Sequence, residues 1–143
     1  MEANQMILEK LQQQFPDKVL EHSEPYGFLT LTISHDAILE VISFLKDEPS
    51  LAYGFLTTCC GLHFPDQHKK FGMMYQLHSL QNNNRIRLKT FTEHDPAVFP
   101  SLTKIFKTAG WMEREAYDFF GYKFTGHPDL RRILNMEIGR AHV

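Results

Sequence analysis

A hairpin in the middle of the chain is the feature that most constrains the fold. Residues 85–92 alternate apolar side chains with basic ones such as Arg87 and Lys89, which is the period of a strand with one buried face. Another strand-like segment, 71–80, precedes it. The asparagines at 82–84 tolerate the left-handed backbone that a tight turn needs. We therefore expect two antiparallel strands whose basic face is exposed to water.

Periodicity and capping residues predict the remaining elements. They are a helix at 4–14, a strand at 27–33, a helix at 34–46, a buried strand at 53–64 and a helix from Pro100 to a C-cap at Gly110. The length of 143 residues suits one domain. The pattern predicts an α+β fold: a single domain with about four strands in a mostly antiparallel sheet, with helices packed on it.

Composition argues against several classes of function. The formal net charge of -2 argues against a protein that binds nucleic acid, since such a protein normally carries a basic excess. No segment approaches the ~18 consecutive apolar residues of a membrane span, so we expect contact with a membrane only through a partner.

Cys59 and Cys60 are the only cysteines. Adjacent cysteines pair only in a strained turn, and two thiols cannot hold a four-cysteine iron–sulfur cluster.

Two catalytic alternatives follow from the residues alone. Carboxyl groups near the C-terminus, with His127, could supply a general acid and base. However, a helical wheel places Glu113 and Glu115 on opposite flanks of one helix, so they do not converge on a substrate. A metal site is also disfavoured, because no histidines have the spacing of a zinc motif; His63 and His68, for example, are five residues apart.

A short amphipathic helix is predicted at 111–120, with Gly121 as its end. The wheel gives an apolar stripe, which comprises Met112, Ala116, Phe119 and Phe120. The charged residues lie beside or opposite this stripe: Glu113 and Glu115 flank it, and Arg114 and Asp118 fall opposite. An ordinary helix with a water-exposed charged face would show this same pattern.

Aromatic residues are unusually dense in this part of the chain. They are Trp111, Tyr117, Phe119, Phe120, Tyr122 and Phe124. Aromatic side chains interleaved with charges are typical of a buried protein–protein interface. Both interpretations, a solvated helix and an interface, stay open on this pattern alone.

The segment 126–134 reads Gly-His-Pro-Asp-Leu-Arg-Arg-Ile-Leu. Its proline can open a helical turn, near whose start Asp129 is favourable. The neighbouring side chains of Arg131 and Arg132 point to different sides. One can pair with Asp129 or Glu115, and the other can bind a carboxylate of a neighbour in bidentate fashion. A surface pair of basic residues is the plain alternative.

These two segments resemble a known family. Residues 113–121 read Glu-Arg-Glu-Ala-Tyr-Asp-Phe-Phe-Gly and, with 126–134, are similar to the signature of the 30 kDa subunit of complex I, the proton-translocating NADH:quinone oxidoreductase. Similarity continues upstream through the hairpin, so that it covers roughly 53–134.

The resemblance implies a cofactor-free, non-catalytic subunit of the peripheral arm, on the cytoplasmic side of the inner (plasma) membrane. It would dock on the quinone-site subunit, which is of the 49 kDa type, beside neighbouring iron–sulfur subunits, and support electron transfer from NADH to quinone. The alternative is the equivalent subunit of a related membrane-bound hydrogenase or of a complex that lacks the NADH module. The implied interface residues are Glu113, Arg114, Glu115, Asp118, His127, Asp129, Arg131 and Arg132.

Two departures from the family pattern are visible. The family often has an aspartate where Thr58 or Cys59 stands. After Leu134 it usually continues into a Pro-Glu-Asp-Trp-like extension, which the residues here do not match. We therefore expect a family domain at 1–134 and an atypical or truncated tail at 135–143.

Overall fold

The structure, a computed structural model, describes residues 2–24, 27–94 and 97–126. The elements in these ranges are α1 (Glu2–Gln14), β1 (Val19–Ser23), β2 (Leu29–Ile33), the 3-10 helix η1 (His35–Ala37), α2 (Ile38–Asp47), β3 (Phe55–His63), β4 (Phe71–Ser79), β5 (Asn84–Thr92), β6 (Val98–Pro100), α3 (Ala109–Phe120) and β7 (Lys123–Thr125). Among these helices, none has the length and apolar character that a membrane span requires.

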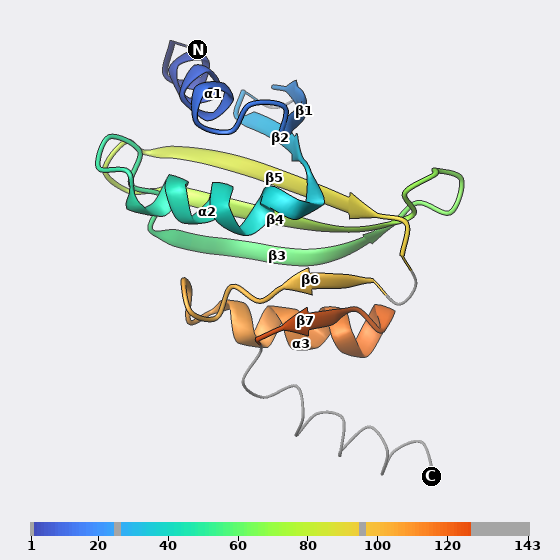
Figure 1. The fold of residues 1–143 in the computed structure, drawn as a ribbon. Coiled ribbons are helices and arrows are strands. Elements are labelled where there is room, and N and C mark those ends of the chain that lie inside the picture. The colour runs from blue at the N-terminus through green and yellow to red at the C-terminus, as the bar shows by residue number, and fades with distance from the viewer. Residues whose placement is uncertain (1, 25–26, 95–96, 127–143) are drawn as a thin grey trace, which may run out of the picture.

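The main sheet has the strand order β1-β2-β5-β4-β3 (Figure 1). Its strands pair antiparallel except where β2 runs parallel to β5. The α+β prediction is confirmed, and the sheet has one strand more than the expected four. The additional strand is β1, which the sequence does not reveal because all of it after Val19 is exposed. A strand that buries neither face shows no alternation of apolar and polar residues.

The predicted hairpin is confirmed. Strands β4 and β5 pair continuously from Phe71 opposite Thr92 to Ser79 opposite Asn84. Asn83, in the turn, has a positive φ of 49°, which is the left-handed conformation expected of an asparagine at this position. The hairpin therefore sets the register of the centre of the sheet.

The predicted helix from Pro100 to Gly110 is wrong. Pro100 instead ends β6, which pairs in parallel with β7 to form a second, two-stranded sheet. The backbone N–H of Ser101 donates to the carbonyl of Thr125 at 3.0 Å, and turns follow up to the start of α3, which contains Gly110. Pairing with a distant strand therefore overrides a local helical pattern.

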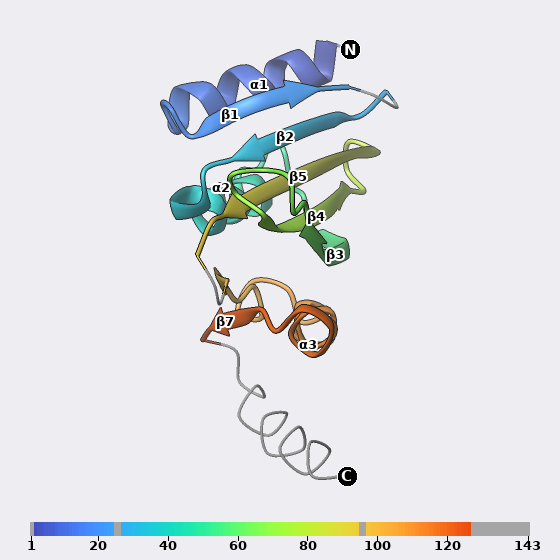
Figure 2. The same cartoon turned by 90° about the vertical axis from the view of Figure 1, so that its right-hand side faces the viewer.

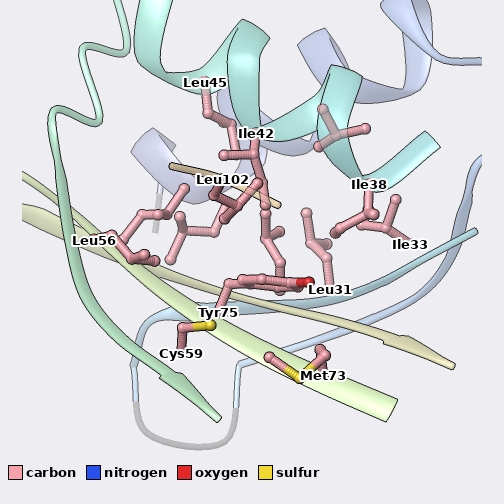
Figure 3. Packing of buried hydrophobic residues seen from close by; sticks show 14 of the residues in the cluster. Leu31, Ile33, Ile38, Ile42, Leu45, Leu56, Cys59, Met73, Tyr75 and Leu102 are labelled. Atoms are coloured by element: carbon pink, nitrogen blue, oxygen red, sulfur yellow. The ribbon is translucent and has the colours of Figure 1, made fainter. Parts of the chain in front are cut away.

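Helices α1, α2 and α3, the last together with β6 and β7, pack against one face of the main sheet (Figure 2). Figure 3 shows Ile42 and Leu45 of α2 pointing toward Tyr75 and Leu31 on the strands, and all four belong to one continuous core. The rings of Phe15, after α1, and Phe44 of α2 meet edge to face with centroids 5.7 Å apart. Figure 2 shows α3 and β7 at the β3 end of the sheet, away from α1.

Helix α2 offers a matched test of this packing. Leu45 is 0% exposed, whereas Leu39 on the same helix is 38% exposed. We expect Leu45→Ala to lower the free energy of unfolding by about 2–5 kcal/mol, because it leaves a cavity in the core. The control Leu39→Ala should change it by no more than about 0.5 kcal/mol. Urea denaturation followed by circular dichroism measures both, and equal losses would contradict this description of the core.

Candidate interaction surface

Helix α3 is oriented differently from the wheel prediction. Its buried residues are Ala109, Glu113, Ala116 and Tyr117. Phe119, which the wheel places on the buried stripe, is instead 83% exposed, and Trp111 is 67% exposed. The prediction is confirmed for Ala116, which is buried, and for Met112, which packs partly buried against the core. It is wrong for Phe119, because the helix is rotated so that Glu113 and Tyr117 also face inward.

Glu113 is buried rather than on the edge of a solvated face. One carboxyl oxygen accepts a hydrogen bond of 2.7 Å from the Ser101 hydroxyl. The other accepts a hydrogen bond of 2.7 Å from the backbone N–H of Leu102. Burying a carboxyl group is costly unless its oxygens are hydrogen-bonded, and both oxygens are satisfied here. Glu113 therefore attaches α3 to the segment that follows β6.

The charge of Glu113 also acts on two buried groups of the sheet. Burial raises the pKa of the Cys59 thiol well above its usual value, and the negative charge of Glu113 raises it further. Burial likewise raises the pKa of the Tyr75 phenol, with smaller contributions from Cys59 and Glu113. Both groups are therefore protonated at neutral pH, and neither is an activated nucleophile.

The C-terminal end of α3 is held by aromatic contacts. The rings of Phe120 and Tyr122 stack with centroids 5.0 Å apart, and the Tyr122 hydroxyl donates to the carbonyl of Leu62 on β3. A Cβ at position 61 would lie 2.5 Å from the Phe120 ring, so Gly61 is needed for this close approach. As predicted, Gly121 ends the helix, with a φ of 76°.

With its inner side fixed in this way, α3 presents its other side to solvent. We call the outward residues the α3 surface: Trp111, Arg114, Glu115, Asp118 and Phe119. The guanidinium carbon of Arg114 lies 5.4 Å from the centroid of the Trp111 ring. Two large exposed aromatic side chains with charges between them are typical of a protein interface.

Four of the eight residues predicted for an interface lie in the part of the chain that the structure describes. Arg114, Glu115 and Asp118 come together on the α3 surface, whereas Glu113 lies inside the fold. The remaining four lie outside the described residues: His127, Asp129, Arg131 and Arg132. The prediction misses Trp111 and Phe119 as individual exposed residues, although the density of aromatics points to this helix.

The three acidic groups of α3 do not converge on one site. Glu113 is buried on one side of α3, while Glu115 and Asp118 are exposed on the other. Nor do three or more His, Cys, Asp or Glu side chains of residues 2–24, 27–94 and 97–126 gather in a group that could hold a metal ion.

Comparison with known families gives one extensive match. The family described as respiratory-chain NADH dehydrogenase, 30 Kd subunit, matches residues 31–141. The chain is 40% identical over 140 residues to the NADH-quinone oxidoreductase C subunit of a Roseiflexus species, a match that covers 97% of this chain and 80% of the relative. It is 46% identical over 109 residues to the corresponding subunit of Xanthobacter autotrophicus, covering 76% of this chain and 52% of the relative. The chain thus spans about half the length of this second relative, as it does for the same subunit from Azorhizobium caulinodans, at 56%.

Two solved structures have a similar fold. One is a trypsin-resistant fragment, 1–134, of Nqo5, with a TM-score of 0.73 at 24% identity, covering 90% of this chain and 99% of the fragment. The other is a chain of a membrane-bound sulfane sulfur reductase, an archaeal respiratory membrane complex, with a TM-score of 0.73 at 20% identity, covering 89% of this chain and 73% of the other.

The contact made by Glu113 can be tested with its neighbour as control. In Glu113→Gln, an amide NH₂ replaces one of the two carboxyl oxygens, so one hydrogen bond from Ser101 or Leu102 loses its acceptor. We therefore expect the free energy of unfolding to fall by about 1.5–3 kcal/mol. Glu115→Gln, on the exposed side of the same helix, should change it by no more than about 0.5 kcal/mol. Chemical denaturation measures both variants. If Glu113→Gln were as stable as the wild type, Glu113 would not hold α3 in place.

Proposed function

Because the chain belongs to the family of the 30 kDa subunit of respiratory-chain NADH dehydrogenase, we propose that it is a structural, cofactor-free subunit of an NADH–quinone oxidoreductase that docks through the α3 surface. The main support for this docking site is that Trp111 and Phe119 are exposed on a helix whose other side is fixed by Glu113. Rigid aromatic side chains are frequent anchors of protein interfaces, because little conformational entropy is lost when they are buried.

The proposed partner is the quinone-site subunit, with iron–sulfur subunits as further neighbours. This choice follows from the resemblance of residues 113–134 to the family signature, and from relatives that are named as subunits of NADH-quinone oxidoreductase. In the proposed role the chain positions its neighbours, and electrons pass from NADH to quinone through groups held by other subunits. The chain would associate with the cytoplasmic side of the membrane only through the assembled complex.

The remaining residues of the predicted interface extend this proposal. His127, Asp129, Arg131 and Arg132 follow α3 and β7 in sequence. Of the two arginines, one is proposed to form a bidentate pair with a partner carboxylate. We propose that these residues continue the contact that the α3 surface begins.

A second candidate role is the equivalent subunit of a related respiratory complex. The fold matches a chain of a membrane-bound sulfane sulfur reductase as well as it matches Nqo5, by TM-score. The more similar curated relatives, at 40–46% identity, are NADH-quinone oxidoreductase subunits, and they favour the first role. In both roles the chain is a docking subunit rather than a freestanding enzyme.

The docking site is tested by co-expressing the chain with the quinone-site subunit of the same organism and separating the products by size-exclusion chromatography. We expect the wild type to co-elute with that subunit. Phe119→Asp should weaken the association by about a hundredfold, because it places a charge in a desolvated contact. The control is Leu80→Asp, at a residue 66% exposed in the turn between β4 and β5, which should co-elute like the wild type.

The behaviour of the two variants shows whether the chain docks through the α3 surface. Retention of the pair by Phe119→Asp, with an unchanged circular dichroism spectrum, would contradict docking through α3. Loss of the pair in both variants would place the contact elsewhere or show that apolar-to-acidic changes perturb the fold.

A further inference from the structure

The main sheet has a second face, opposite the helices, that no described helix covers. Strand β5 places three cations on it, Arg85, Arg87 and Lys89, at every second residue. Side chains two residues apart on a strand lie about 7 Å apart on the same face. The sequence predicts this basic face, and the structure shows that Arg87 and Lys89 are half-buried on it while Arg85 is exposed.

Arg85 lies opposite His78 on β4, and the direct neighbours of the other two cations on the sheet are uncharged. Arg87 lies opposite Thr30 on β2 and Gln76 on β4. Lys89 is opposite a threonine and a methionine on the same two strands. The carboxyl-bearing residue in register with them, Glu21, is on β1, two strands away. None of the ion pairs found among the described residues includes a cation of β5.

Among the described residues, Arg87 contacts the uncharged side chains of Phe28 and Gln76. Its guanidinium carbon lies 5.1 Å from the centroid of the Phe28 ring, and one of its terminal nitrogens donates a long hydrogen bond of 3.4 Å to Gln76. Its Nε is buried and has no hydrogen-bond partner. A guanidinium has five donors arranged to match a carboxylate, so this one is oriented and incompletely satisfied.

A groove of about 590 Å³ adjoins the Lys89 end of this row. Its apolar walls include Leu20, Phe64 and Phe91. Lys69 adds a second cation to the one from Lys89, and Glu21 places one carboxyl group on the β1 side of the groove. The Phe91 ring lies over Gly72, where a Cβ would approach it to 2.5 Å. Leu20 and Phe64 are about half exposed, so the groove offers an apolar surface beside positive charge.

We propose that this face is a second protein–protein interface, which binds an acidic segment of a partner polypeptide across Arg85, Arg87 and Lys89 with an apolar side chain in the groove. Carboxylates supply the charge that the row lacks, and the groove accepts the kind of anchor that interfaces bury. The net charge of -2 and the half-buried position of the cations favour a protein over nucleic acid or an anionic membrane. The interface is separate from the α3 surface and does not depend on the partner proposed for it.

The test uses the tagged full chain isolated in its native assembly from its host, with carbodiimide as a zero-length cross-linker between amines and carboxyl groups. Mass spectrometry should identify an amide bond between Lys89 and an aspartate or glutamate of another polypeptide. Acetylation of Lys89 should be about tenfold slower in the assembly than in the isolated chain, because a buried interface excludes reagent. Lys10 on α1, also half-buried, is the control and should react equally in both states.

Variants of Arg87 separate charge from geometry. Arg87→Glu should reduce recovery of the Lys89 cross-link by about tenfold or more, and Arg87→Lys, which keeps the charge but loses the planar fork, should reduce it less. Lys10→Glu should leave recovery unchanged, and thermal melts confirm that each variant is folded.

Several results would overturn the proposal. One is that the chain purifies without a partner. Another is that Lys89 forms cross-links only within the chain. A third is that Lys89 is acetylated equally fast in the assembly and in the isolated chain. Protection of Lys89 that disappears on nuclease treatment or on removal of lipid would assign the face to nucleic acid or to a membrane instead. Because the readout is a bond at Lys89, its failure is distinguishable from a failure of docking through α3.

Discussion

The hydrogen bonds of the Glu113 carboxyl group are the contacts on which the orientation of α3 depends. By accepting from Ser101 and from the backbone of Leu102, this group fixes the rotation of α3 and joins that helix to the end of β6. The helix can bury Ala116 and Tyr117 only in this rotation, and Trp111 and Phe119 then face solvent. A polar contact inside the fold therefore determines which apolar side chains remain available outside it, because a buried carboxyl group without partners would be costly.

The main sheet separates two different surfaces of the molecule. One face is covered by the helices α1, α2 and α3, and the contacts of α3 with β3 include the Phe120 ring against Gly61. The other face carries the cations of β5, and the direct neighbours of Arg87 and Lys89 there are uncharged. The two proposed surfaces, one on α3 and one on the uncovered face of the sheet, would let the subunit hold two neighbouring proteins. This is the role proposed for the chain within its family.

The sequence predicts those parts of the fold in which local pattern and burial agree. The β4–β5 hairpin is visible because its alternation is regular and asparagines occupy its turn. The parallel pairing of β2 with β5 is not visible, because it joins residues more than 50 positions apart. The helix expected after Pro100 fails because Ser101 bonds to Thr125, and the wheel misplaces Phe119 because it treats Glu113 as a solvated residue. In the last two cases, a tertiary hydrogen bond outweighs a local preference.

The most direct measurement of the central claim is hydroxyl-radical footprinting of the subunit alone and bound to the quinone-site subunit. Trp111 and Phe119 are largely exposed in the structure, so both should be oxidised rapidly in the free chain. On binding, oxidation of both should slow by about tenfold or more, since interface anchors are shielded from water, while oxidation of the exposed Leu80 should stay constant. Unchanged oxidation of Trp111 and Phe119 in the bound subunit would contradict docking through α3.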